Sequence, residues 1–486
     1  MPERSGDLGL LLMAKALASA IVLALGFRAV SDDDFSRVVL AQLFAVSPKL
    51  DPSGSSWLPF PFWLSGSVFL VVGRSLFVAR AFAVVLGLVS ALLVAFAARR
   101  LSTSRTGALA GAVIAAVFPW SARLAVATVP ELLTAAFSLY AASLLVGPDP
   151  RGSSRLLGGF FIFGATLSRY DAWPVAIIFS LFCIKDAAHE HSLSLKSRVK
   201  IGFGAFVSLV GPLGWIVWNY LSHGNAFDFL DRVAAYRRAL GEGEDGRFSH
   251  LLAYPMVMAK HEPEVFVFCV LLLGAICLPM FSRLRAEALR PYSRPFAIAL
   301  FQILFLSVAL VKDGAPTHHA ERAILFCLLL MAVFVGDIGT KIVLDLGRVS
   351  RFLVVGSALA LLGLSIRFVR PAFPQESFNT RENEVDLGLA SAELVPRGER
   401  VLVDVNDYGY FAFMAAFARP EDIVLDRDID PRKPQKESAF QDAAVLRQKA
   451  AETRVTFFIG ATDNKNLREI AEPRHTSGPL ALWVLR

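Results

Sequence analysis

The sequence predicts a polytopic α-helical membrane protein with about eleven transmembrane helices, surface helices in the first outer loop and a small C-terminal α/β domain. Three observations lead to this fold class. Of 486 residues, 55% are hydrophobic and only 19% are charged, which is unusual for a soluble domain. Long apolar runs recur along the chain and are separated by short clusters of Lys and Arg. After about residue 370 the chain becomes charged, and its apolar runs become short.

The charge distribution favours a membrane over nucleic acid as the partner of the basic residues. The formal net charge is +7, but Lys and Arg lie in short clusters between apolar runs, a pattern typical of topology signals and lipid headgroup contacts. The four cysteines occupy apolar segments without metal-ligand spacing, so we expect them to be core residues. They are Cys183, Cys269, Cys277 and Cys327.

The apolar runs predict eleven membrane spans, the first of them a retained span rather than a cleaved signal. They lie near residues 8–30, 76–98, 107–122, 131–147, 156–168, 174–185, 201–221, 264–281, 295–311, 322–340 and 351–369. Basic clusters such as "ARRLSTSR" alternate with loops of lower basic density, which places the N-terminus in the cytoplasm. We therefore expect a multi-pass protein of the cytoplasmic (inner) membrane whose C-terminal domain is extracytoplasmic.

The first outer loop begins with "FRAVSDDDFSRVVLAQL", residues 27–43, directly after the first apolar run. Phe35, Val38 and Val39 form one face of a short helix. The following "SSWLPFPFWLSGSVFLVVG" is rich in Trp and Pro. Both segments fit helices that lie along the membrane surface with an aromatic anchor at headgroup depth.

The chain after residue 370 predicts an α/β domain, because short strands alternate with helix-like stretches. The strands are expected at 400–405, 422–426, 455–460 and 481–486, and the helices at 409–417, 437–452 and 464–472. This segment has neither a Gly-rich phosphate loop nor paired acids at catalytic spacing, so we assign it a structural or acceptor-positioning role. Its best binding candidate is "VNDYGYFAF", although Asp407 there is more often a helix cap.

Three consecutive carboxylates, Asp32, Asp33 and Asp34, stand where the chain leaves the membrane. One explanation is helix capping, in which Asp33 or Asp34 accepts backbone N–H groups of the helix that starts near Phe35. Capping needs one carboxylate, however, and adjacent carboxylates repel, which raises a pKa or recruits a cation. The triplet is therefore a candidate for either function or capping.

Three further motifs fall on the outer side of the predicted topology, and each has a structural alternative. The acid in "VPELLTAAF" could be a first-turn acid favoured by the helix dipole. The segment "SRYDAWP" could be an interfacial turn, and the cations of "KDGAPTHHAERAILF" could belong to a solvated loop with a snorkelling arginine. The chemistry-bearing residues in these motifs are Glu131, Arg169, Tyr170, Asp171, Lys312, His318 and Arg322.

Together these motifs resemble the C-type glycosyltransferase superfamily, nearest its protein O-mannosyltransferase and aminoarabinose-transferase (PMT/ArnT-like) branch. The shared features are "DDDFSR" after the first span, the Trp/Pro segment, "VPELLTAAF", "LSRYDAWP", "HHAERAILF" and an outer α/β tail. The chain departs from the pattern at Ala172, where the family usually has glycine, and at Asp171, where glutamate is common. The triplet also leaves the register of the key aspartate ambiguous.

The resemblance implies a transmembrane glycosyltransferase domain over residues 1–370 and an extracytoplasmic domain over 371–486. The implied reaction moves a sugar, with inversion, from a polyprenyl-phosphate donor to a hydroxyl of a glycan, lipid or protein acceptor. By motif position Asp33 is the base, Asp34 assists it and Asp32 is the alternative. Glu131 would orient the acceptor or share a divalent cation with Asp33; no cofactor is implied with certainty.

The resemblance also implies which residues bind the substrates. The donor phosphate would be bound by Arg169, His318 and Arg322, with Lys312 next, and the substrate by Tyr170, Asp171 and Trp57. Two other classes stay open, a lipid-linked polysaccharide polymerase or ligase, which would favour outer-loop Arg and His over an acidic base, and a transporter, which would place charges at mid-membrane in paired halves. Lys15 is the one clear mid-span charge, and the sequence shows no internal repeat.

Overall fold

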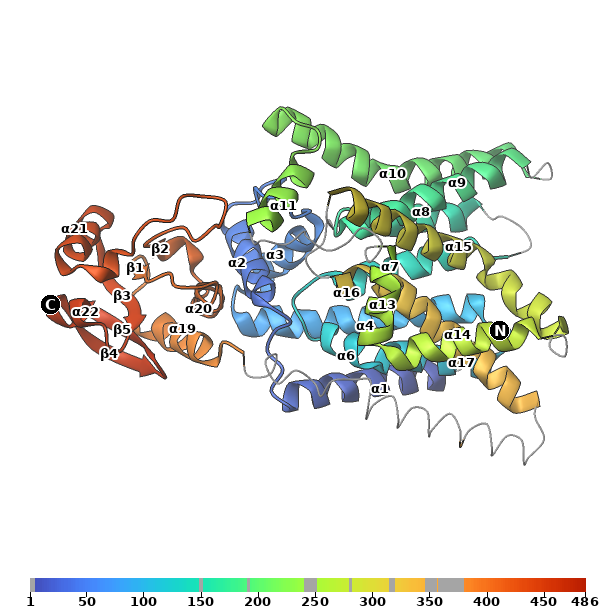
Figure 1. Ribbon diagram of the computed structural model, residues 1–486, viewed down its shortest axis with the longest axis horizontal. Helices are drawn as coiled ribbons and strands as arrows, with labels where there is room; N and C mark the ends of the chain where they lie inside the picture. The colour runs from blue at the N-terminus through green and yellow to red at the C-terminus, as the bar shows by residue number, and fades with distance from the viewer. Residues whose placement is uncertain are drawn as a thin grey trace.

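The computed structural model of the chain describes residues 5–147, 152–189, 193–239, 251–278, 282–313, 320–345, 356 and 380–486. It consists of a long bundle of helices with a sheet-containing domain at one end (Figure 1). Two short helices, α2 (Asp32–Val46) and α3 (Phe60–Val72), lie between the bundle and the sheet (Figure 1). The predicted span at 351–369 lies outside the described residues, apart from Gly356.

The bundle helices follow the apolar runs of the sequence. They are α1 (Ser5–Ala24), α4 (Leu76–Leu101), α5 (Arg105–Val117), α6 (Pro119–Leu124), α7 (Glu131–Ser143), α8 (Gly152–Thr166), α9 (Trp173–His189), α10 (Leu195–His223), α13 (Ala253–His261), α14 (Pro263–Cys277), α15 (Ser282–Asp313), α16 (Ala320–Ala323) and α17 (Leu325–Asp345). Six helices in the described part of the chain are long and apolar enough to cross a membrane. The structure thus supports a multi-pass helical protein, while the number eleven stays a prediction.

The span predicted at 107–122 is broken, because Pro119 starts α6 directly after α5 ends. Lys15 of α1 satisfies the backbone at this break: its Nζ donates to the carbonyl oxygens of Ala116 (2.7 Å) and Ser121 (3.0 Å). Backbone groups in a membrane need such partners. The one clear mid-span charge of the sequence therefore has a structural role here.

Small residues let several helices approach closely. A Cβ atom on Gly159 of α8 would collide with the backbone of Gly204 in α10, and one on Gly111 of α5 would collide with the backbone of Val333 in α17. Helix pairs in membranes commonly associate through such small residues. These contacts fix α10 on α8 and α17 on α5.

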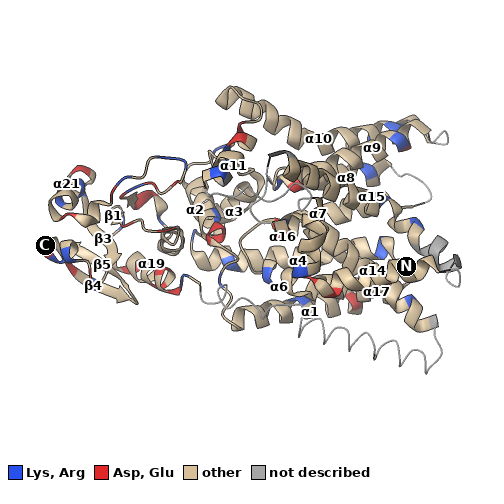
Figure 2. Cartoon of the chain, in the orientation of Figure 1, with Lys and Arg blue, Asp and Glu red and all other residues tan. Residues whose placement is uncertain are grey.

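A buried ion-pair cluster joins α8, α9 and α15 far from the sheet. Arg155 donates from Nη2 to Asp186 Oδ2 at 2.8 Å, and Arg294 donates to Asp186 Oδ1 at 2.6 Å. Arg155 is 2% exposed and also donates to the carbonyl oxygens of Leu144 and Leu145. Basic residues gather at this end of the bundle, opposite the sheet (Figure 2).

The C-terminal region contains a five-stranded sheet in the order β2-β1-β3-β5-β4. Strands β1 (Arg400–Val403), β2 (Ile423–Leu425) and β3 (Val455–Ala461) are parallel, while β4 (Ala471–Ser477) and β5 (Leu480–Leu485) are antiparallel. The four expected strands are present. The sheet's helices are α19 (Glu382–Leu394), α20 (Tyr410–Phe417), α21 (Ala443–Thr453) and α22 (Lys465–Ile470).

Two elements of this region differ from the sequence prediction. The helix expected at 464–472 ends at Ile470, and the chain continues as β4. Strand β4 was missed because its exposed face is polar and it contains Pro473, a residue that disfavours a strand prediction. Helix α19 was also missed; it is weakly amphipathic and lies beside α20 and β4.

Helix α20 packs on α2, so the sheet-containing region and the first outer loop share one core. Phe35 and Val38 of α2 lie in the same buried cluster as Leu387 and Phe413. Gln42 of α2 is fully buried and donates to the carbonyl oxygen of Ala415 at 2.9 Å. Helix α2 is thus held on one side by the bundle and on the other by the C-terminal region.

Candidate active site

The three aspartates at the start of α2 have three different partners. Asp32 pairs with Arg381 of the C-terminal region at 2.9 Å. Asp33 pairs with Arg322, which precedes α17, at 3.0 Å. Asp34 turns into the protein and is only 2% exposed. The three aspartates therefore have different environments: Asp32 and Asp33 each pair with an arginine, and Asp34 is buried.

Asp34 is the capping acid of the triplet. Ser31 and Asp34 form a capping box at the N-terminus of α2, where the Asp34 carboxylate accepts the backbone N–H of Ser31. The same carboxylate accepts the N–H of Val30 (3.0 Å) and of Thr128 (2.9 Å). Burial raises the pKa of Asp34 to about 6, against these hydrogen bonds and Arg322, which lower the pKa. Its position fixes α2 to the segment before α7.

Arg322 connects Asp33 with Glu131. The Arg322 Nη1 atom lies 3.0 Å from Asp33 Oδ2 and 3.7 Å from Glu131 Oε1, and its Nη2 donates to Ser31. Glu131 is the first residue of α7 and is 1% exposed. Asp33 is more accessible, with 35% of its side chain exposed. Residues 289 positions apart in the chain thus meet at the start of α2.

Arg169 lies on the other side of Glu131. Its Nη1 donates to Glu131 Oε1 and its Nε donates to Asp171 Oδ1, both at 2.6 Å. Glu131 Oε2 is buried and has no hydrogen-bond partner in the described part of the chain. Arg169 therefore bridges the carboxylates of Glu131 and Asp171. Because both carboxylates occupy its N–H groups, a phosphate has little access to its guanidinium.

Arg37 is the residue of this site that the sequence analysis did not single out. It lies one helical turn after Asp33, so the two share a face of α2. Arg37 is 9% exposed, and its guanidinium stacks on Trp57 at 4.4 Å from the ring centroid. No carboxylate pairs with it among the residues that the structure describes. The spacing of Asp33 and Arg37 in "DDFSR" was the signal that could have found it.

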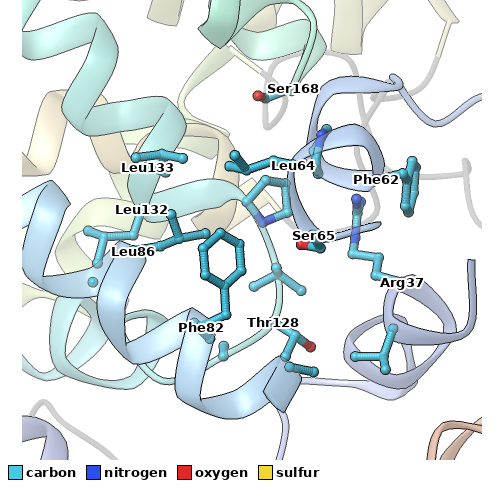
Figure 3. Close-up of a pocket in the computed structure, with 18 of the residues that line it drawn as sticks. Arg37, Phe62, Leu64, Ser65, Phe82, Leu86, Thr128, Leu132, Leu133 and Ser168 are labelled. Atoms are coloured by element: carbon cyan, nitrogen blue, oxygen red, sulfur yellow. The ribbon is translucent and has the colours of Figure 1, made fainter. Parts of the chain in front are cut away.

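The unpaired Arg37 lines a largely apolar pocket between α2, α3, α4 and the segment 124–133 (Figure 3). Arg37 and Phe62 stand on one side of it, and Leu86, Leu132 and Leu133 on the other (Figure 3). Among its polar members, Thr128 donates to the carbonyl oxygen of Asp34, and Ser168 directly precedes Arg169. The pocket thus joins an apolar interior to the polar cluster around Asp33.

Trp57 and Tyr170 pack around the site through aromatic and hydrogen-bond contacts. Trp57 stacks on Phe62. The Tyr170 hydroxyl donates to the carbonyl oxygen of Ser56 at 2.7 Å and accepts from Trp215 Nε1 at 3.0 Å. The Tyr170 ring stacks on Phe229 of α11 (Asp228–Ala239) at 4.7 Å. Tyr170 and Trp57 therefore position the first outer loop against α10 and α11.

Two of the predicted phosphate ligands cannot be placed. His318 lies outside the described residues, and Lys312 belongs to the last turn of α15 with its side chain undescribed.

A divalent cation shared by Asp33 and Glu131 does not fit the geometry, because Arg322 lies between these two carboxylates. Within the described residues no three His, Cys, Asp or Glu side chains gather in a way that could hold a metal ion.

Comparison with known proteins identifies the fold. Residues 53–218 match the family model described as dolichyl-phosphate-mannose-protein mannosyltransferase. No curated protein sequence matches the chain significantly.

Three solved structures are similar over most of the chain. ArnT from Cupriavidus metallidurans bound to undecaprenyl phosphate has a TM-score of 0.61 at 12% identity, covering 99% of this chain and 98% of that one. ArnT from the same organism in the apo state has a TM-score of 0.55 at 12% identity, covering 96% and 97%. The oligosaccharyltransferase AglB from Archaeoglobus fulgidus, in complex with an inhibitory peptide and a dolichol-phosphate, has a TM-score of 0.51 at 12% identity, covering 93% of this chain and 69% of AglB.

The helical bundle, the candidate spans and the ArnT-like fold define a multi-pass membrane protein. The chain is similar to proteins of the PMT/ArnT-like branch, as its motifs predicted.

Proposed function

We propose that this chain is an integral-membrane inverting glycosyltransferase that moves a sugar from a polyprenyl-phosphate donor to an acceptor hydroxyl. The family match over residues 53–218 and the ArnT-like fold support a transferase of this kind. The similar ArnT structure holds undecaprenyl phosphate, and the AglB structure holds a dolichol-phosphate and a peptide. A lipid-linked donor is therefore the natural substrate class for this chain too.

The observation that carries the proposal is the shared face of α2. Asp33 is a half-exposed carboxylate, and Arg37, one turn later, is a buried cation without a carboxylate partner in the described residues. Arg37 lines an apolar pocket, and Asp33 precedes it by one helical turn on the same face of α2. A polyprenyl phosphate has the matching shape, with an apolar tail for the pocket and an anionic group for Arg37.

We propose the following reaction for residues at these positions. Asp33 accepts the proton of the acceptor hydroxyl while the hydroxyl oxygen attacks the anomeric carbon. The bond from that carbon to the phosphate oxygen breaks, and the phosphate leaves with the electron pair. Arg37 stabilises the charge that develops on the phosphate. Attack opposite to the leaving group inverts the anomeric centre in one displacement.

The surrounding ion pairs fix the positions of the side chains that take part in this step. Arg322 pairs with Asp33 at 3.0 Å and holds its carboxylate at the start of α2. Arg322 is buried at 2% exposure and can also attract the donor phosphate. Glu131, held by Arg169, lies 3.7 Å from Arg322 and orients it.

We propose that this chemistry takes place on the outer side of the inner membrane. We infer that residues 1–370 form the membrane domain with a cytoplasmic N-terminus, and that 371–486 form an extracytoplasmic domain. The gathering of basic residues at the far end of the bundle supports this orientation (Figure 2). The site and the sheet then lie together on the outer side.

The test is donor consumption in membranes. Lipid-linked sugars are quantified by mass spectrometry after expression of the wild type or of Asp33→Asn in cells that lack the gene. The proposal predicts that the wild type depletes one polyprenyl-phosphate sugar, and that Asp33→Asn leaves it at the level of the empty vector. Equal lipid-linked sugar pools in all three membranes contradict the proposal.

A further inference from the structure

We propose that Arg381 is a positioning residue of the transfer reaction, and that the C-terminal region acts through it on Asp33. This inference rests on the proposed function. It concerns an arginine that lies far from the membrane motifs in the sequence and touches no part of the pocket. Its contact with the site is Asp32, the neighbour of the proposed base.

Arg381 binds carboxylates from three elements. Its Nε and Nη2 donate to the two oxygens of Asp32 at 3.0 and 2.9 Å, which is a bidentate pair. Its Nη1 donates to Asp407 after β1 at 2.8 Å and to Glu384 of α19 at 3.1 Å. The guanidinium thus joins α2, α19 and the end of β1.

The backbone around Arg381 is built for this contact. Arg381 has a φ of 61°, in the left-handed region that a residue with a side chain seldom adopts. Gly409 leaves the necessary space, because a Cβ atom there would stand 2.6 Å from Arg381 Nη1 and 2.7 Å from Glu384 Oε1. A strained backbone and a cleared space indicate that the position of this guanidinium matters.

The consequence for the site is that the first turn of α2 is held from two sides. Arg381 draws Asp32 toward the C-terminal region, while Arg322 draws Asp33 toward the bundle. Arg381 also compensates the charge of Asp32, which would otherwise repel the adjacent Asp33. The direction of the Asp33 carboxylate therefore depends on a residue of the C-terminal region. Asp32, with both oxygens bound, is a support for the base and not the base.

A second ion pair between the two regions supplies a matched control. Arg74, between α3 and α4, pairs with Glu421 of the C-terminal region at 2.8 Å. This pair also joins the C-terminal region to the membrane part, but it involves no residue of the triplet. Arg74→Gln weakens the attachment of the C-terminal region, whereas Arg381→Gln weakens the attachment and also releases Asp32.

The experiment measures kcat and the KM values for donor and acceptor with the purified full-length chain, together with Tm. We expect Arg381→Gln to lower kcat about 10- to 100-fold, as a misplaced catalytic group does, and to change the donor KM less than about threefold, since Arg381 lies outside the pocket. Arg381→Lys keeps the charge but not the bidentate pair, so its kcat should be intermediate. Arg74→Gln should keep the wild-type kcat.

Two further variants keep the inference testable if Arg381→Gln folds poorly. Gly409→Ala displaces the guanidinium without removing its charge and should also lower kcat. In a double-mutant cycle, adding Asp32→Asn to Arg381→Gln should cost little more than Arg381→Gln alone, because both act through one contact.

Three outcomes would overturn the inference while leaving the proposed function intact. They are a wild-type kcat for Arg381→Gln, equal losses for Arg381→Gln and Arg74→Gln, and additive losses in the cycle with Asp32→Asn. If instead the wild type transfers no sugar, or Asp33→Asn keeps full activity, the proposed function itself fails.

Discussion

Replacing Arg37 should affect activity and stability differently: we expect the activity to fall and the stability to stay the same or to rise. The guanidinium is 9% exposed, stacks on Trp57 and pairs with no carboxylate in the described part of the chain. Burying a charge without a partner costs several kcal/mol, and stacking on an aromatic ring returns only about 0.5–2 kcal/mol. The change Arg37→Gln should therefore leave the folded protein as stable as the wild type or more stable.

The same change should weaken catalysis strongly. A charge-assisted hydrogen bond to a phosphate contributes about 1.5–3 kcal/mol. At about 1.4 kcal/mol per tenfold change, its loss lowers kcat/KM for the polyprenyl-phosphate donor by about 10- to 150-fold. The loss should fall mainly on kcat if Arg37 acts on the charge that develops in the transition state, and on KM if it binds the donor equally in the ground state.

The assay combines donor turnover in detergent or nanodiscs with thermal unfolding of the same preparation. Arg419→Gln is the matched control, since Arg419 also stacks on an aromatic ring, Phe417, at 4.4 Å but lies in the C-terminal region away from the pocket. The control should keep its activity. Normal kcat/KM in Arg37→Gln, or a fall in Tm that accounts for the lost activity, would refute the role given to Arg37.

The other predictions concern stability. Asp34→Ala removes the cap of α2 and leaves the Thr128 N–H without its acceptor, so it should destabilise the protein by about 2–4 kcal/mol, measured by denaturant or thermal unfolding. Burial raises the pKa of Asp34 from 3.8 to about 6, so the stabilisation that comes from its bound proton is full below about pH 4 and is lost as the pH rises through about 6, while its hydrogen bonds remain. Asp34→Asn should flatten this part of the Tm profile, and an identical profile would contradict the assignment. Asp186→Asn leaves Arg155 and Arg294 without their shared carboxylate and should cost about 3–5 kcal/mol while the kcat of the folded fraction stays normal; an unchanged Tm would contradict this.

The sequence predicted much of the fold because its signals are local. A long apolar run identifies a span. The sequence analysis expected Asp33 or Asp34 to cap a helix starting near Phe35, whereas α2 starts at Asp32, with Ser31 as its N-cap and Asp34 completing the capping box. The break at Pro119 could not be placed by hydropathy, since the apolar run continues through it. The exposed strand β4 carried no apolar pattern, and α19 carried only a weak one, so both were missed.

The sequence indicated which residues belong to the candidate site but not which carboxylate pairs with which arginine. The structure brings Asp33, Glu131, Arg169 and Arg322 together, as the order of motifs implied. Which carboxylate meets which arginine depends on contacts between residues hundreds of positions apart, and no local pattern encodes these. Arg381 reaches Asp32 across 349 residues, and only the folded chain shows that Arg37 stacks on Trp57 and pairs with no acid among the described residues.

The most direct test of the central claim compares the three neighbouring aspartates in purified protein. Initial rates of sugar transfer and Tm are measured for Asp32→Asn, Asp33→Asn and Asp34→Asn. The account predicts that Asp33→Asn loses about 10²- to 10⁴-fold in kcat with a Tm like that of the wild type. It predicts a smaller loss for Asp32→Asn and a change in stability for Asp34→Asn. Full turnover by Asp33→Asn would contradict the account, because the base would then lie elsewhere.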